Sequence, residues 1–497
     1  MFTCVVLLTV LAVPTDCHKI LVYIPQMGHS HMNFLGHLAD TLVRAGHDVV
    51  VYTPEYDTRI KTNGTKLARV IRRSSKFTLP PDSNHLNDNA WIRDGDDISE
   101  VYYFTLPPDS NHLNDNAWIR DGDDISEVYY KPCGVADSLS DEKLLAQLRA
   151  EKFDVGISEV ISSCGFGIFE KIGLKKYIAA FATNLLPIST EPFGIDNNPS
   201  YVPGWIFSTS SKKTIAKSTF IFVNADEFVE FPRPITHKIV YVGGIAVDPP
   251  KPLDGELRKA MDAAVGGAVL LSFGSIAQSS KMTPAMKKAF VEAFRSFPKI
   301  QFIWKYEIDD DIAEDIPNVM KRKWIPQNDL LGHPNMRAFV SHGGMNSLTE
   351  SVRAGVPIVC IPLFGDQMRN AKMVEKRGVA VVLEKHNLTA NAILWAFTTV
   401  LTDQSFLESS RRLAKMIAKK PFPVDERVVK YTEFAIEFGQ VNNLDSAARK
   451  LNFSQYYLID IIVPLLLILL FFIYIVAWII IYVFRRFFNS ISKSKLD

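Results

Sequence analysis

The residues most suited to bind a ligand lie in the segment 324–367, which alternates apolar and polar runs. An apolar, strand-like run ends just before His342, and a pair of glycines follows it. A helix is predicted over residues 345–354, with Gly355 and a nearby proline as its stop signal. A second buried strand is predicted over residues 358–363. The pattern is therefore a strand, a glycine turn, a helix and another strand.

This unit has the chemistry of a phosphate-binding site. Glycines let backbone amides approach a ligand closely, and the N-terminus of a helix offers unpaired N–H groups and positive potential. In open α/β sheets, ligands bind at the carboxyl ends of the strands. His342, Ser347 and Asp366 all fall at such ends or at the helix start beside them. Because glycine pairs are common in turns, a β-α-β unit without any ligand is the alternative interpretation.

The same segment resembles, nearly residue for residue, the donor-binding signature of the UDP-glycosyltransferases, from its opening Trp-x-Pro-Gln to its closing Asp-Gln. The resemblance implies an α/β protein with the GT-B fold, in which two Rossmann-like domains face each other across a cleft. It also implies an inverting sugar transfer that needs no metal. No cofactor is expected, because the UDP-sugar is a co-substrate. The resemblance further implies that the transferred group is a hexosyl group, and the choice between glucuronosyl and glucosyl stays open.

The signature implies a role for each of its polar residues. Trp324 would lie against the uracil, Gln327 would contact the uridine, and Glu350 would accept hydrogen bonds from the ribose hydroxyls. The other implied donor-binding residues are Ser275, His342, Gly344, Asn346 and Ser347 for the diphosphate, and Asp366 and Gln367 for the sugar hydroxyls.

The resemblance also implies a catalytic base near the N-terminus. An acceptor hydroxyl must lose its proton as it attacks the anomeric carbon, and histidine titrates in the useful range. In the family this base is the histidine of a Ser-His pair after the first strand, which here is Ser30-His31 in a predicted loop. His29 and His37 are better explained as loop-capping or solvated residues. A metal site at His29 and His31 lacks a third ligand nearby. From the position of the Ser-His pair, the resemblance implies that His31 is the general base.

Glu159 is the predicted partner of this base. The family places an acid at the end of a strand that reads Phe-Asp-Val, usually an aspartate, and there it orients the histidine. Glu159 stands at that position and keeps the charge on an arm that is one methylene longer. A surface acid without such a role is the alternative interpretation.

The chain is long enough for two domains and several appendages. We predict an acceptor-binding Rossmann-like domain over residues 18–245 and a UDP-sugar-binding one over residues 246–440. Helices are expected over residues 390–401 and 405–417, packing back across the domain interface.

The first domain departs from the family pattern in two ways. Residues 77–103 recur unchanged as residues 104–130, and two copies are too few for a solenoid. We interpret this repeat as a recent exon duplication or a gene-model error. The stretch around residues 203–218 is also shorter than the acceptor-side segment of the family. A catalytically impaired UDP-sugar-binding subunit or isoform, with a damaged acceptor domain, therefore remains an alternative function.

Both ends of the chain carry apolar segments. Residues 1–17 resemble a secretory signal peptide. Residues 458–484 predict a transmembrane helix whose last 24 residues carry no charge, a length of about 36 Å. Basic residues in the tail, residues 485–497, predict a cytosolic tail and a luminal body in a single-pass, type I arrangement. Lys493 and Lys495 resemble a dilysine signal, which predicts the endoplasmic reticulum membrane.

Composition argues against several other classes of protein. With 55 basic and 54 acidic residues the net charge is +1, which lacks the basic excess typical of nucleic-acid-binding proteins. After signal cleavage Cys133, Cys164 and Cys360 would remain without a CxxC pair, so neither a disulfide framework nor a zinc site is supported. Asn63 and Asn387 head glycosylation sequons on the predicted luminal side. The expected partners are UDP-sugar, a small lipophilic acceptor and the membrane, with a homo- or hetero-oligomer left open.

Overall fold

We describe the protein from a computed structural model. It covers residues 17–26, 28–55, 60–74, 141–160, 164–185, 190, 193, 195, 212–275 and 277–493, with side chains up to residue 486. The predicted signal peptide up to residue 16, both copies of the repeat and most of the segment 203–218 lie outside these described residues.

The first domain is built on a seven-stranded parallel sheet in the order β3-β2-β1-β4-β5-β6-β7. Its strands are β1 (Lys19–Tyr23), β2 (Asp48–Glu55), β3 (Arg69–Ser74), β4 (Val155–Glu159), β5 (Tyr177–Phe181), β6 (Ile221–Val223) and β7 (Ile239–Tyr241). The helices between them are α1 (His29–Arg44), α6 (Glu142–Ala150), α7 (Cys164–Lys171) and α9 (Lys212–Ile215). Strands covered on both faces are mostly apolar, and β4 and β5 are buried at every residue. The exceptions are Ser158 and Glu159, the polar residues that end β4.

The second domain repeats this plan with a six-stranded parallel sheet in the order β10-β9-β8-β11-β12-β13. Its strands are β8 (Ala268–Ser272), β9 (Gln301–Lys305), β10 (Val319–Arg322), β11 (Met336–Ser341), β12 (Ile358–Cys360) and β13 (Ala380–Val382). Its helices are α10 (Gly255–Ala263), α11 (Pro284–Arg295), α12 (Gln327–Leu331), α13 (Met345–Ala354), α14 (Gln367–Lys376), α15 (Ala390–Thr402) and α16 (Gln404–Ala418), with short 3-10 turns η2 (Ser279–Lys281) and η3 (Lys385–Asn387).

The strand order of each sheet reverses at one point, between β1 and β4 in the first sheet and between β8 and β11 in the second. Connections leave such a point in opposite directions, which opens a crevice at the carboxyl ends of the strands. His31 follows β1 and Glu159 ends β4, while His342 follows β11. The predicted catalytic pair and the predicted phosphate turn therefore occupy the two switch points.

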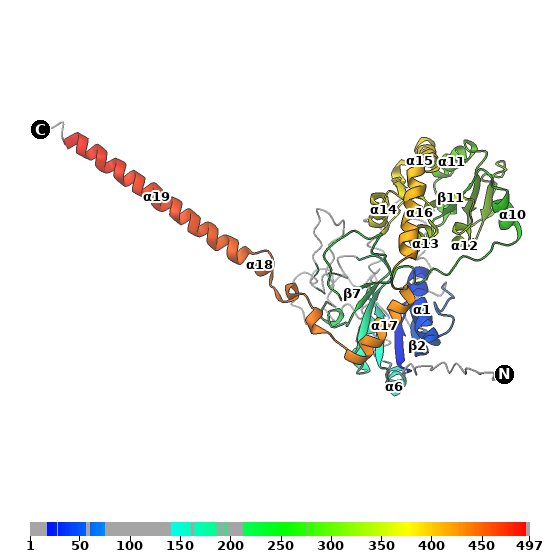
Figure 1. Cartoon of the computed structure of the whole chain (residues 1–497), viewed down its shortest axis with the longest axis horizontal. Helices are drawn as coiled ribbons and strands as arrows, with labels where there is room; N and C mark the ends of the chain where they lie inside the picture. Colours follow the sequence, from blue (N-terminus) through cyan, green and yellow to red (C-terminus); the bar gives the residue numbers. More distant parts are fainter. Residues whose placement is uncertain are drawn as a thin grey trace, which may run out of the picture.

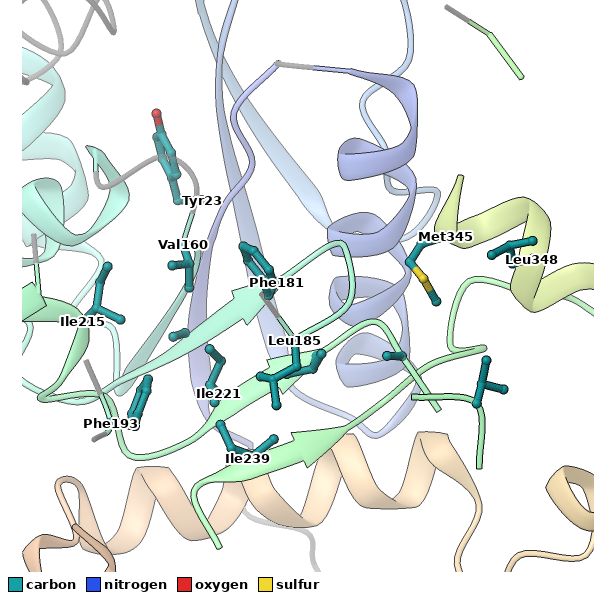
Figure 2. Close-up of a cluster of buried hydrophobic side chains, with 14 of the residues drawn as sticks. Tyr23, Val160, Phe181, Leu185, Phe193, Ile215, Ile221, Ile239, Met345 and Leu348 are labelled. Atoms are coloured by element: carbon teal, nitrogen blue, oxygen red, sulfur yellow. The ribbon is translucent and has the colours of Figure 1, made fainter. Parts of the chain in front are cut away.

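The helix predicted over residues 345–354 is confirmed as α13. Gly355 ends it in the left-handed conformation, with φ 70°. Met345, Leu348 and Val352 recur at helical spacing and are buried. They join a core cluster that continues into the first domain, where Figure 2 shows Met345 and Leu348 at one side of Leu185 and Phe181. The helix that begins at the glycine turn thus also packs against the other domain.

The expectation that residues 390–401 and 405–417 pack across the domain interface is met only by the second of these helices. α15 packs on α11 inside the second domain, whereas α16 packs on α13 and its Leu413 and Ile417 lie in the core cluster that continues into the first domain. A further helix, α17 (Val424–Phe438), passes onto the first domain, where it lies beside α1 in Figure 1 and contacts β4 and β5. Its Val428, Ala435 and Ile436 lie in the same buried cluster as the residues of β1 and α1. The amphipathic pattern predicts a helix but not which of two apolar surfaces the helix will cover.

A long apolar helix follows the two domains. After η4 (Asn442–Leu444), η5 (Ala447–Lys450) and α18 (Phe453–Tyr456), helix α19 (Ile459–Lys493) runs away from the body as a single rod (Figure 1). Its segment Ile459–Arg486 has 28 residues and contains an 18-residue stretch with a mean hydropathy of 3.0. At 1.5 Å per residue the whole segment is about 42 Å long, enough to cross a membrane.

Candidate active site

The predicted base and its partner acid are in contact. His31 Nδ1 lies 3.0 Å from Glu159 Oε2, and the Glu159 side chain is fully buried. The backbone N–H groups of Val160 and Ala182 donate to the same carboxylate, at 3.1 and 3.3 Å. These three contacts fix the orientation of the carboxylate. Because Nδ1 is held, Nε2 is the ring nitrogen that remains to accept a proton.

The structure corrects the local setting of this histidine. His29 and His31 were expected in a loop, but α1 begins at His29 and contains both. The first turn closes with Met32 N donating to Gly28 O at 3.1 Å. The buried residues Met32 and Leu35 extend the apolar stripe of the helix back to its start. His31 is therefore held by a helix, which positions a side chain more rigidly than a loop does.

Two carboxylates set the pKa of His31. Burial by itself would lower the pKa of this imidazole, but the hydrogen bond and the charge of Glu159 raise it, and the charge of Asp366 raises it further. The net result is a pKa above the ordinary value of 6.5. The charges that act on His31 thus come from both domains, and Ser30, the residue before it, accepts a hydrogen bond from Asn346 of the second domain.

The glycine turn after β11 surrounds His342. Gly343 has φ 84°, and a Cβ at Gly344 would lie 2.5 Å from His342 Nε2. The Nδ1 atom of His342 is buried and finds no hydrogen-bond partner among the residues that the structure describes. Burial, together with the charge of Lys305, lowers the pKa of His342 to about 4. His342 is therefore a neutral imidazole with an unused ring nitrogen beside the start of α13.

The predicted nucleoside residues form one connected group. Gln327 Nε2 donates to Ser347 Oγ at 3.2 Å and to Glu350 Oε2 at 2.6 Å. Burial raises the pKa of Glu350 to about 7. Trp324 precedes Gln327 by three residues and is 70% exposed, and Lys305 Nζ lies 5.9 Å from its ring centroid. An exposed indole is suited to stack on a flat base.

Asp366 and Gln367 stand at the start of α14. Burial raises the pKa of Asp366, and Asn370 Nδ2 donates to its Oδ2 at 2.8 Å. Gln367 Oε1 accepts from the backbone N–H groups of Leu363 and Phe364, at 2.9 and 3.1 Å. The amide oxygen of Gln367 therefore shapes the loop before the helix, and only its NH₂ group remains for a ligand.

The remaining predicted donor residues lie around these groups. Asn346, on the first turn of α13, accepts from Asn224 Nδ2 at 2.9 Å, and its own Nδ2 donates to Ser30 O at 3.5 Å. Ser275 is exposed in the turn after β8. The structure thus gathers the predicted residues of both domains at the facing carboxyl edges of the two sheets.

Sequence reasoning missed several polar residues of this region. They are Asn184, Asn224, Lys305 and Asn370. Asn184 and Asn224 follow β5 and β6 at the ligand-binding edge, and Asn370 stands four residues after Asp366 on one helix face. Position at a strand end or helical spacing was a signal that could have identified all of them.

Comparison with known proteins identifies the family. Residues 206–494 match the family model described as UDP-glucoronosyl and UDP-glucosyl transferase. The chain belongs to this family. It is 37% identical over 283 residues to UDP-glucosyltransferase 2 of Dactylopius coccus. The aligned residues cover 57% of this chain and 54% of that protein. It is 28% identical to the putative UDP-glucuronosyltransferase ugt-48 of Caenorhabditis elegans, over 92% of this chain and 94% of that protein.

Solved structures support the fold. The glycotransferase of kitacinnamycin superposes with a TM-score of 0.57 and 16% identity, covering 86% of this chain and 99% of the other. CalG4, the calicheamicin glycosyltransferase, gives a TM-score of 0.55 with 18% identity over 85% of this chain and 99% of the other. These likenesses confirm the predicted GT-B fold of two Rossmann-like domains, here followed by one apolar helix.

Proposed function

We propose that this UDP-glycosyltransferase moves a glucuronosyl or glucosyl group from UDP-sugar to a hydroxyl of a small lipophilic acceptor, with inversion and with His31 as the general base. The observation that carries the proposal is the contact between His31 and buried Glu159, placed close enough to Asp366 for the carboxylate charge to raise the pKa of the imidazole. A base on one domain thus faces a sugar-recognising residue on the other.

The reaction follows from this arrangement. His31 Nε2 would take the proton of the acceptor hydroxyl as its oxygen forms a bond to the anomeric carbon. The bond between that carbon and the UDP oxygen breaks, and its electron pair leaves with UDP. Glu159 stabilises the imidazolium that forms. The backbone N–H groups at the start of α13 and the positive end of its dipole would stabilise the charge on the departing diphosphate.

Each predicted donor residue has a proposed role in this state. Trp324 stacks on the uracil, and Gln327 orients Glu350 towards the ribose hydroxyls. Asp366 and the NH₂ group of Gln367 hold the sugar hydroxyls. The diphosphate lies at the glycine turn, against His342, Gly344, Asn346, Ser347 and Ser275. Neutral His342 can donate to phosphate oxygen without a competing titration near pH 7.

The proposed location is the endoplasmic reticulum membrane, with the two domains in the lumen. Helix α19 is long and apolar enough to anchor the chain. Basic residues Arg485 and Arg486 follow the apolar run, which favours a cytosolic tail.

The alternative function, a UDP-sugar-binding subunit without turnover, is favoured by the repeated residues 77–103 and the short stretch near residues 203–218. One experiment separates the two. The full chain, purified in detergent, is incubated with UDP-glucose or UDP-glucuronate and a panel of small phenols, and products are sought by mass spectrometry. A hexosyl mass increase on any acceptor supports the enzyme. Binding of UDP-sugar without product supports the subunit, and absence of binding contradicts both.

A further inference from the structure

Two neighbouring residues of α14 reach into the first domain. Asn184, just after β5, donates from its Nδ2 atom to Asn370 Oδ1, and both side chains are fully buried. One residue earlier on the helix, Arg369 NH2 lies 2.5 Å from Glu230 Oε1. Glu230 Oε2 also accepts from Leu185 N at 3.0 Å. The loop that carries Asn184 and the first turn of α14 are therefore joined by two adjacent pairs.

Asn370 connects this junction to the donor site. Its NH₂ group donates to Asp366 Oδ2 at 2.8 Å and to Gly343 O at 2.9 Å. An asparagine amide has two N–H donors and one oxygen acceptor. Both donors are used inside the second domain, and the acceptor is used by Asn184. The first domain thus completes the set of contacts that orients the amide beside Asp366.

We propose that Asn184 is a positioning residue, which fixes the sugar-recognising carboxylate of Asp366 through Asn370 when the two domains are closed. The inference rests on the proposed role of Asp366 in binding the sugar. Recognition of the sugar part of the donor then depends on a residue of the acceptor domain. Binding of the uridine part does not depend on Asn184, because Gln327 and Glu350 contact each other within the second domain.

The test compares ligands with and without the sugar. Dissociation constants of UDP, UDP-glucose and UDP-glucuronate are measured by calorimetry on the full chain in detergent. One of the two UDP-sugars will bind wild type more tightly, and that ligand is used for the comparison. Asn184→Ala is expected to lower the affinity for it by about tenfold, because a hydrogen bond in a charged network is lost. The affinity for UDP should stay within about twofold, which is below the effect of one hydrogen bond.

Glu227→Gln is the matched control. Glu227 also makes a cross-domain contact, to Lys420 Nζ at 2.6 Å and to Arg427 NH1 at 3.3 Å, but it does not contact α14. If the ratio of UDP-sugar to UDP affinity changes equally in Glu227→Gln, general loosening of the interface explains the effect and the proposal is wrong. In the double variant Asn184→Ala/Asn370→Ala, the ratio should match that of Asn370→Ala alone, since Asn184 acts through Asn370.

Other outcomes overturn the proposal or its foundation separately. An unchanged ratio in Asn184→Ala contradicts the positioning role, and an equal loss of UDP and UDP-sugar affinity shows a structural role instead. Asp366→Asn tests the foundation: if it leaves the ratio unchanged, the proposed donor site is wrong. Melting temperatures are recorded for every variant, and Asn184→Ser, which keeps a small polar side chain, gives the same comparison if Asn184→Ala does not fold.

Discussion

At the scale of single residues, the chemistry depends on how buried charges are balanced. Burial favours the neutral form of His31, and the carboxylates of Glu159 and Asp366 favour the charged form. The carboxylates prevail in the free protein, so the pKa of His31 lies above its ordinary value. A group in this state is a stronger base once it is deprotonated, and it loses its proton at a higher pH.

The first prediction concerns the pH dependence of transfer. Only neutral His31 can act as a base, so kcat/KM should rise with pH through a pKa above 6.5. In Glu159→Gln the carboxylate charge of residue 159, which raises the pKa of His31, is gone, while burial still lowers that pKa. The rise of kcat/KM should therefore occur at a lower pH than in wild type. The plateau should fall by about 100-fold or more, because the imidazolium loses its partner.

Asp154→Asn is the control for this measurement. Asp154 lies just before β4, at the opposite end from Glu159, and accepts from Lys19 N at 2.7 Å. Its removal should leave the pH profile unchanged. A rise of kcat/KM that stays at the same pH in Glu159→Gln would show that the titrating group is not His31.

At the scale of elements, the turn from β11 into α13 combines two glycines with different duties. Gly343 has a positive φ of 84°, which residues with a side chain rarely adopt. A Cβ added at this position would lie 2.8 Å from Cys360 Sγ. Gly344 has φ −64°, which any residue adopts, and its Cβ would meet only the His342 ring. One glycine allows the turn to form, and the other leaves room for the ring.

The second prediction separates these duties. Gly343→Ala should lower the free energy of unfolding by about 1–2 kcal/mol, the cost of a left-handed non-glycine residue, and further through the clash with Cys360. Gly344→Ala should displace His342 and weaken UDP binding, with little change in melting temperature. Thermal unfolding and UDP titration of both variants check this. Equal losses of stability in the two would contradict the assignment.

Local patterns predicted much of this region from the sequence. The segment 324–367 contains its own strand, turn and helix signals, and α13 forms at the predicted residues. Glu159 was expected at a strand end and ends β4, in contact with His31. These features depend on nearby residues or on a family motif, so tertiary context had little to add.

What the sequence could not predict depends on contacts between distant residues. His31 was expected in a loop, because the start of α1 has no strong cap signal and Gly28 offers no side-chain oxygen. The destination of α17 depended on which apolar surface was left uncovered. The junction of Asn184 with Asn370 joins residues that are 186 positions apart, and no local pattern identifies such a pair.

At the scale of the whole molecule, one acidic segment joins the two domains. Residues 224–231 follow β6, and their carboxylates contact cations that come later in the chain: Asp226 pairs with Lys420 at 2.7 Å and Glu230 pairs with Arg369 at 2.5 Å. A buried ion pair is stabilising only when its geometry and its hydrogen bonds are complete. Glu230 meets this condition through Leu185 and Phe231, whose N–H groups donate to it. The domains are thereby held with His31 on the side of the proposed donor site.

The third prediction concerns the orientation of the chain in the membrane. Asn387 is exposed, whereas Asn63 is half-buried in a segment where the hydroxyl of Thr65 donates to Asp40. If the domains are luminal, the protein made in secretory cells should carry a glycan on Asn387 that an N-glycanase removes. Asn387→Gln should abolish that shift in mobility, while Thr389→Ser, which preserves the sequon, should not. A chain that shows no shift in the wild type would contradict the luminal assignment.

The most direct test of the account compares transfer and donor binding in wild type and His31→Ala. If His31 is the general base, the variant should lose transfer by at least about 100-fold, because a positioned base contributes that much or more. Its dissociation constant for UDP-sugar should change by no more than about twofold, because the proposed donor contacts lie in the second domain. Retained transfer, or an equal loss of transfer and of UDP-sugar binding, would contradict the catalytic role of His31.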